Sequence, residues 1–120
     1  MNHEFLAELG EKNFSRRSFT VKERVHHSHG QTYLEIYNIR NCKLEKYVDM
    51  VVYPMSTEHC QNLVNLANKH NVVIVPYGGG TNVTQSLLLP QEEKRMIVSC
   101  DMTRMNSIKW VDKENGLACV

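Results

Sequence analysis

Three consecutive glycines at residues 78–80 follow a short β-branched run and precede Thr81 and Asn82. Glycine loses more conformational entropy on folding than any other residue, so a triplet favours a backbone that another group must approach closely. Without side chains, successive N–H groups can converge on an anion, and the Thr81 hydroxyl adds another donor. Pro76 fixes the backbone where the chain leaves the run. The pattern predicts a loop that cradles a diphosphate, which offers these donors many acceptors.

Other phosphate-binding motifs fit this loop poorly. A P-loop carries a lysine after its last glycine, whereas here Thr81 follows directly. The Rossmann fingerprint GxGxxG opens a helix, but residues 81–86 are polar and β-branched and begin no convincing helix. The remaining alternative is an ordinary flexible turn between two elements of secondary structure.

Histidine, cysteine and methionine, which often bind metals, show no spacing typical of a ligand set. His26 and His27 are neighbours, so they point to different faces of any regular element, and His29 follows two residues later. No CxxC pair occurs among the cysteines. We expect surface or packing histidines, reduced thiols and packing methionines, and we assign neither a metal ligand nor a catalytic residue. These cysteines and methionines are Cys42, Cys60, Cys100, Cys119, Met96, Met102 and Met105.

The composition is that of an ordinary globular domain. With 120 residues and a formal charge of +1, the chain can bury one small core and has no general attraction for nucleic acid. No apolar run approaches the ~20 residues that span a bilayer. Residues 1–10 do not resemble a signal peptide, so we expect an intracellular protein. Since the sequence stops at Val120 inside a predicted strand, we also expect an incomplete domain.

A strand–helix–strand pattern is predicted to position the glycine loop. Two short strands, residues 51–53 and 72–75, flank a helix that we expect at residues 57–70. Ser56 is a good N-cap for this helix, and Asn71 ends the helical pattern. The run 72–75 does not alternate, which is typical of a strand covered on both faces in a βαβ unit. The apolar stripe of the helix is predicted to comprise Cys60, Leu63, Val64 and Ala67.

The chain on either side of this unit predicts an α+β fold with a mixed sheet. Residues 96–100 form a third predicted strand, and residues 107–120 a hairpin with an Asn-Gly turn and a half-buried Trp110. Earlier in the chain, residues 5–9 predict a helical turn ended by Gly10, and residues 33–39 fit a helix or a strand equally well. We therefore divide the chain into an irregular, partly helical N-terminal segment (1–48) and the first part of a larger domain (49–120).

These segments resemble a known family in their order. VVIVPYGGGTNV (72–83), followed by a strand and DMTRMN (101–106), is similar to the first subdomain of the PCMH-type FAD-binding domain in vanillyl-alcohol-oxidase-type flavoproteins. FLAEL (5–9), ERVHHSHGQTYLEIYNIR (23–40) and DMVVYP (49–54) extend the resemblance to the alkylglycerone-phosphate synthase family. One departure is Ser86, where the family usually has glycine.

The resemblance implies FAD as cofactor, with the loop around its diphosphate. The implied FAD contacts are Pro76, Tyr77, Gly78, Gly79, Gly80, Thr81 and Asn82. It also implies a peroxisomal alkyl transferase that exchanges the acyl chain of acyl-dihydroxyacetone phosphate for a fatty alcohol. Such an enzyme would be a homodimer that contacts membrane surfaces but no nucleic acid, and its catalytic residues would lie outside this chain. The alternatives are an FAD-linked oxidase or dehydrogenase of hydroxy acids, and a non-catalytic phosphate-binding or interaction module.

Overall fold

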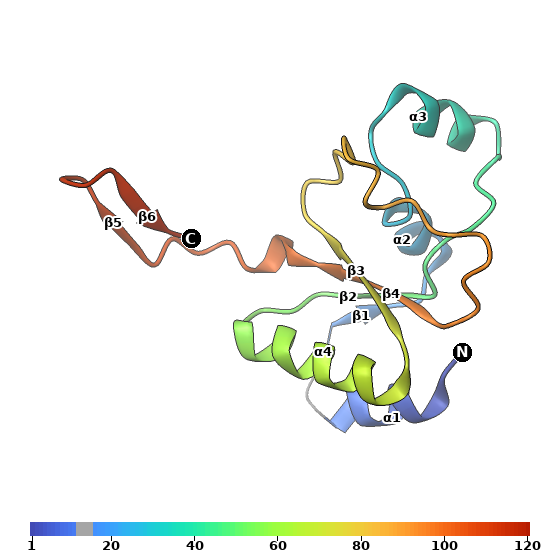
Figure 1. The fold of residues 1–120 in the computed structure, drawn as a ribbon, viewed down its shortest axis with the longest axis horizontal. Helices are drawn as coiled ribbons and strands as arrows, with labels where there is room; N and C mark the ends of the chain where they lie inside the picture. The colour runs from blue at the N-terminus through green and yellow to red at the C-terminus, as the bar shows by residue number, and fades with distance from the viewer. Residues whose placement is uncertain (12–15) are drawn as a thin grey trace.

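The structure is a computed structural model that describes residues 1–11 and 16–120. It has the predicted mixed α+β composition (Figure 1). The elements in chain order are α1 (His3–Glu11), β1 (Arg17–Ser18), α2 (Val21–His26), α3 (Tyr33–Arg40), β2 (Met50–Val52), α4 (Thr57–His70), β3 (Val73–Tyr77), β4 (Ile97–Asp101), the 3-10 helix η1 (Met102–Arg104), β5 (Trp110–Asp112) and β6 (Leu117–Cys119).

The main sheet has the strand order β1-β2-β4-β3, with β1 antiparallel to β2 and the other three strands parallel. The chain passes from β2 through α4 to β3, and β4 later fills the space between these two strands. Tyr77 at the end of β3 lies in register with Asp101 at the end of β4. The glycine loop therefore begins beside the carboxyl end of the central strand.

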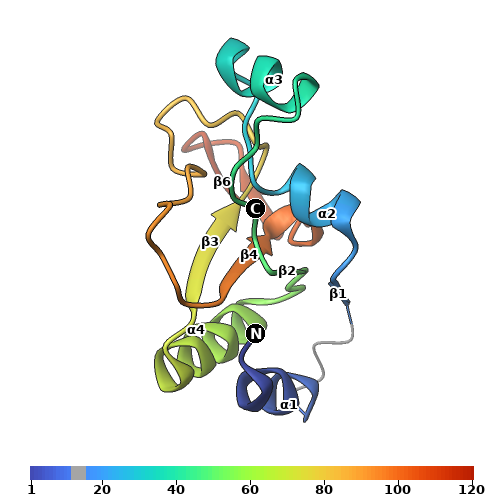
Figure 2. The same cartoon turned by 90° about the vertical axis from the view of Figure 1, so that its right-hand side faces the viewer.

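Helix α4 has the predicted bounds because both of its ends are capped locally. Ser56 accepts a hydrogen bond from the His59 N–H at 3.2 Å, and Asn71 takes the left-handed conformation with φ 53°. The predicted buried stripe is wrong at Val64, which is 48% exposed, and omits the buried Leu66. The reason is tertiary: α1 packs beside α4 and shifts the buried face by part of a turn (Figure 2).

The main sheet separates two apolar clusters. On the face covered by α1 and α4, one cluster includes Phe5, Leu9, Met50, Val52, Leu63, Leu66, Ala67, Val98 and Cys100, with Met102 packed against it. On the other face, the second cluster comprises Val48, Val51, Leu89 and Ile97. Every residue of β4 is buried because this strand has a neighbour on both sides.

Strand β3 is only half buried, so the prediction of a strand covered on both faces is wrong for this structure. The reason is its position at the sheet edge, beside β4 alone. The Val73 N–H donates to the Met96 carbonyl at 2.9 Å, so by alternation Ile74 and Pro76 direct their backbone nitrogens to the open edge. Proline has no N–H to leave unpaired there, and Pro76 therefore lies within the strand rather than after it.

The N-terminal segment is more helical than predicted. Helix α1 continues through Gly10, and α2, which the sequence did not reveal, begins at the N-cap Thr20. The ambiguous residues 33–39 lie in α3, where Thr32 and Glu35 form a capping box. None of the helices in the described part of the chain is long and apolar enough to cross a membrane.

The predicted hairpin is present as β5 and β6, and Gly116 in its turn has a φ of 66°. It projects away from the body of the molecule (Figure 1). Trp110 lies in β5 and is 53% exposed, as expected of a half-buried strand residue.

Candidate cofactor-binding site

Gly80 is required by the fold itself. Its φ of 67° lies in the left-handed region, and a Cβ at this position would come within 2.3 Å of the Tyr77 hydroxyl oxygen. Tyr77 is buried beneath the loop, with its ring centroid 4.5 Å from that of His27 and its hydroxyl 3.4 Å from His26 Nε2. The aromatic side chain thus supports the turn from below, and only glycine leaves room for it.

Gly78 and Gly79 are different, because nothing inside the described chain requires a glycine at either position. Neither has a φ in the left-handed region. A Cβ on Gly78 would meet no atom within 4 Å, and one on Gly79 would meet only the Thr81 methyl carbon at 4.0 Å. Among the described residues, none accepts a hydrogen bond from the backbone N–H groups of residues 78–81. The loop therefore has unpaired N–H donors next to open space. Side chains at positions 78 and 79 would occupy that space, and their absence leaves room for a bound diphosphate.

Asn82 fixes the far end of the loop from inside the protein. It is 6% exposed and has a φ of 55°. Its amide donates to Glu35 Oε1 at 2.5 Å, and its carbonyl oxygen accepts from the Leu87 N–H at 2.8 Å. A Cβ on Gly30 would come within 2.0 Å of the Asn82 Cβ, so that glycine allows the start of α3 to pack on the loop. Both polar atoms of the Asn82 side chain are thus hydrogen-bonded within the protein.

Glu35 is the charged centre of this anchor. Burial favours a higher pKa for its carboxyl, but hydrogen bonds from Thr32, Gly30 and Asn82 outweigh burial and lower the pKa below its usual value. The carboxylate accepts from the Gly30 N–H at 2.7 Å and from the Thr32 hydroxyl at 2.6 Å. It therefore remains ionised near neutral pH and joins α3 to the loop.

A buried ion pair lies below the same edge of the sheet. His27, which is 2% exposed, places Nε2 at 2.8 Å from Asp101 Oδ2 and Nδ1 at 2.7 Å from the Glu23 carbonyl. The imidazole of His27 therefore bridges the Glu23 carbonyl on α2 and the Asp101 carboxylate on β4. Burial acts to raise the pKa of Asp101, but hydrogen bonds from His27 and Thr103 lower it below its usual value. His27 is a packing histidine, as predicted, and fastens α2 beneath the loop.

The comparison with family models gives this loop a context. The model described as "FAD binding domain" matches residues 48–120. The chain belongs to this family. FAD is accordingly the cofactor of the domain, and the open donors of residues 78–81 fit its diphosphate.

Several relatives of this FAD-binding domain are named alkyldihydroxyacetonephosphate synthase. The chain is 35% identical to the alkyldihydroxyacetonephosphate synthase of Caenorhabditis elegans over 99% of its own length and 20% of that protein. It is 40% identical to the synthase of Trypanosoma brucei brucei over 79% of its length and 16% of that protein. A solved structure titled "alkyldihydroxyacetonephosphate synthase in P1" has a TM-score of 0.90 at 34% identity, covering 98% of this chain and 23% of the solved one. The chain thus spans about a fifth of the relatives it matches.

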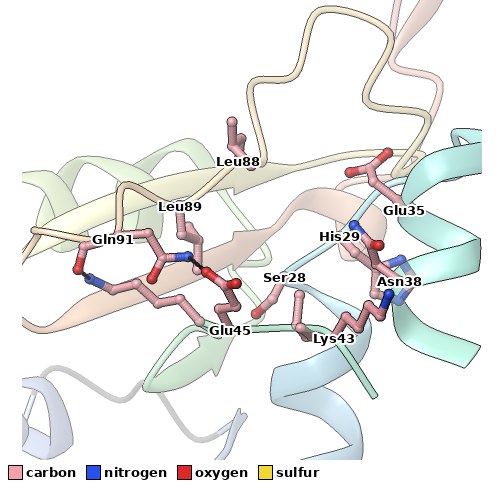
Figure 3. A pocket seen from close by; sticks show the side chains of 11 residues that line it. Ser28, His29, Glu35, Asn38, Lys43, Glu45, Leu88, Leu89 and Gln91 are labelled. Carbon is pink, nitrogen blue, oxygen red and sulfur yellow. Dashed lines mark hydrogen bonds between the residues drawn. The ribbon is translucent and has the colours of Figure 1, made fainter. Parts of the chain in front are cut away.

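Two hollows lie near the anchors of the loop. One, of about 270 Å³, opens between α3, the segment after it and the loop before β4, and His29, Asn38 and Lys43 lie along one side of it (Figure 3). The other, of about 600 Å³, runs along α2 from Val21 to His29 and reaches Asp101. Neither is lined by the glycines, so the loop faces the outside of the FAD-binding domain rather than an internal cavity.

The predicted FAD contacts thus fall into three groups, and their role toward FAD stays a prediction. Pro76 and Thr81 are exposed, whereas the side chains of Tyr77 and Asn82 are buried inside the protein. Of the glycines, Gly80 is required by the fold, and Gly78 and Gly79 are not. The supporting residues that the sequence analysis missed are Gly30, Glu35 and Asp101. The pairing of Thr32 with Glu35 three residues later was the one local signal for them.

Proposed function

We propose that this chain forms the diphosphate-binding part of an FAD-dependent alkylglycerone-phosphate synthase, which exchanges the acyl chain of acyl-dihydroxyacetone phosphate for a fatty alcohol. The observation that carries the proposal concerns Gly78 and Gly79. No contact inside the described chain requires a glycine at either position, so the absence of side chains there is explained by a bound group. The identity with synthases along nearly the whole chain supports the choice of reaction within the FAD-binding family.

Within that reaction, the residues of this chain bind and orient. The backbone N–H groups of residues 78–81 would donate to the diphosphate oxygens of FAD, and the Thr81 hydroxyl could add another bond. The flavin supplies the reacting ring once FAD is bound. Tyr77 and Asn82 hold the two ends of the loop, so the donors are in position before the cofactor arrives. We assign no catalytic residue to this chain.

The proposal includes the cellular setting that such a synthase implies. The substrates are lipids, acyl-dihydroxyacetone phosphate and a fatty alcohol. We propose a peroxisomal location, contact with a membrane surface and a homodimeric assembly for the whole enzyme. These properties rest on the likeness to the synthases alone.

A chimera tests the proposal directly. This chain would replace the segment that it matches in the Caenorhabditis elegans synthase, and the purified chimera would be assayed for flavin absorbance and for alkyl exchange. We expect bound FAD and activity in the chimera. Gly79→Val should remove both, because its side chain takes the place of the phosphate, and two lost charge-assisted bonds cost about 3 kcal/mol, or roughly a hundredfold in affinity.

The matched control is Gly10→Ala on α1, where a Cβ would meet only the Arg17 guanidinium at 3.6 and 3.7 Å. This variant should keep its flavin and its activity. A folded chimera without flavin, or Gly79→Val with full flavin content, would show that the loop does not bind the diphosphate. A flavin-loaded chimera that exchanges no alkyl chain would leave the FAD-binding role and refute the synthase reaction.

A further inference from the structure

Positive charge is concentrated at the edge of the sheet opposite β3. Residues 16–24 carry four basic side chains and one acidic one, whereas the whole chain has a formal charge of only +1. They form β1 and the first part of α2, which lie along one side of the molecule (Figure 2). The acidic residue, Glu23, accepts a hydrogen bond from the Tyr53 hydroxyl at 2.6 Å. Its carboxylate is therefore bonded to the body of the protein.

Three of the basic side chains are available to an external partner. Arg16, Arg17 and Lys22 are exposed, and no carboxylate in the described part of the chain forms an ion pair with them. Arg16 lies on the Tyr53 side of the sheet, whereas the Arg17 guanidinium lies beside Gly10 of α1. Since successive strand residues point to opposite faces, the two arginines flank the rim of the sheet.

Two apolar side chains lie between these cations in the sequence. Phe19 is 41% exposed and Val21 is 65% exposed. Val21 and Lys22 also line the hollow of about 600 Å³ that runs along α2. We call Arg16, Arg17, Phe19, Val21 and Lys22 the basic edge.

Protection of an open sheet edge does not explain the basic edge. Charged side chains on an edge strand do prevent pairing with another chain. However, β1 has only two residues and offers little edge to protect. The exposed Phe19 and Val21 would also promote association rather than prevent it. Cations that surround exposed apolar side chains are instead typical of a surface that binds anionic lipid.

The aromatic residues near this edge do not form a platform for nucleobases. The Arg16 guanidinium lies over the Tyr53 ring at 5.4 Å from its centroid, and that of Arg24 lies over the Tyr47 ring at 4.7 Å. Proteins that bind single-stranded nucleic acid stack successive bases on several aromatic rings. With both tyrosines packed against arginines, the basic edge fits a lipid surface better than a nucleic acid.

We propose that the basic edge docks on an anionic lipid surface. Phe19 and Val21 enter the boundary between headgroups and acyl chains, and the three cations contact the anionic headgroups. The inference locates, within this chain, the membrane contact proposed above for the whole enzyme. Its choice of a lipid partner rests on that proposed function, whose substrates are lipids.

Cosedimentation of the whole chain with vesicles tests the proposal. We expect binding to vesicles of phosphatidylcholine with phosphatidylserine, weaker binding to phosphatidylcholine alone, and loss of binding as salt screens the charges. The variant Arg16→Gln/Arg17→Gln/Lys22→Gln should bind the anionic vesicles roughly a hundredfold more weakly, because each cation near such a surface contributes about fivefold. Val21→Ser should also weaken binding without lowering the melting temperature, since its side chain is mostly exposed.

The matched control is Lys94→Gln/Lys109→Gln/Lys113→Gln, which removes the same net charge from exposed residues outside the basic edge. This variant should keep most of the vesicle binding. The proposal is overturned if the wild-type chain does not bind anionic vesicles, or if the two triple variants lose binding equally. It is also overturned if the chain binds a single-stranded oligonucleotide more tightly than the vesicles and the edge variant loses that binding.

The two proposals fail in different measurements, because the edge variant leaves the glycine loop unchanged. A chain that does not bind vesicles, together with a flavin-loaded chimera, refutes the docking surface and leaves the FAD-binding role. A flavin-free chimera, together with a chain that binds anionic vesicles through the basic edge, refutes the FAD-binding role and leaves the docking surface.

Discussion

The same substitution at two adjacent glycines should have opposite consequences for stability. Gly80→Ala places a Cβ at 2.3 Å from the Tyr77 hydroxyl in a left-handed backbone, whereas Gly79→Ala places one in open space. The left-handed conformation costs an L-residue about 1–2 kcal/mol, and overpacking a buried side chain costs about 1–3 kcal/mol. We therefore expect Gly80→Ala to lower the free energy of unfolding by about 2–5 kcal/mol. Gly79→Ala should change it by less than about 1 kcal/mol, in the stabilising direction.

Urea unfolding of the purified chain, followed by far-UV circular dichroism, measures both changes. In a thermal melt, Gly80→Ala should lower the midpoint by roughly 8–20 °C for a domain of this size. Combining Gly80→Ala with Tyr77→Phe removes the nearest clashing atom but leaves the ring carbon at 2.7 Å, so it should recover only part of the loss. Equal stability changes for the two alanine variants would refute the division of the glycine triplet into a structural and a ligand-facing part.

Two further predictions concern the supports of the loop, and a third concerns the end of α4. Asp101→Asn replaces the carboxylate that is bonded to the buried His27 and to Thr103 by a neutral amide and should cost about 1–3 kcal/mol. Because the pKa of Asp101 is lowered on folding, the stabilisation by its carboxylate is present near neutral pH and is lost as the pH falls through that pKa. Acid titration of unfolding should therefore be shallower in the variant. Asn82→Ala removes two hydrogen bonds and leaves the buried Leu87 N–H without its acceptor, costing about 2–3 kcal/mol in urea unfolding. Asn71→Gly relieves a φ of 53° and should raise the melting temperature slightly.

Each of these has a contrary outcome or a control. An acid-unfolding curve of Asp101→Asn parallel to that of the wild type would mean that the pair does not titrate on folding. Asn68→Ala is the control for Asn82→Ala, because Asn68 is exposed on α4 and should tolerate the change. A melting temperature of Asn71→Gly below that of the wild type would show that the asparagine side chain itself stabilises the helix end.

The elements that could be predicted are those whose signals are local. Helix α4 has its N-cap and its left-handed end in the adjacent residues, and the β5–β6 turn has its Asn-Gly pair. Helix α2 could not be predicted, because only six residues form it and distant partners hold it: His27, just after it, bonds Asp101 across 74 residues, and Glu23 bonds Tyr53 across 30. The burial of Leu66 rather than Val64 likewise depends on where α1 packs. The spacing of apolar residues in α4 alone does not predict that position.

The candidate site shows the same division. The glycine loop was visible in the sequence because glycine runs are rare and costly, but the different roles of Gly79 and Gly80 depend on where the Tyr77 ring lies. The anchoring of Asn82 could not be predicted either, since its partner Glu35 is 47 residues away. Local sequence therefore predicted the presence of the loop, and tertiary contacts determine its shape.

The N-terminal segment consequently supports the candidate cofactor site although it supplies no donor to it. Helix α2 holds Tyr77 through His26 and His27, and the start of α3 holds Asn82 through Glu35. Between these two fixed points lie the exposed Gly78, Gly79 and Thr81 and the buried Gly80. Donors that are fixed beforehand lose little entropy when an anion binds, so rigid supports raise affinity without adding a contact. A GGGT loop without such supports should therefore bind a diphosphate more weakly, even with an identical sequence from residue 78 to residue 81.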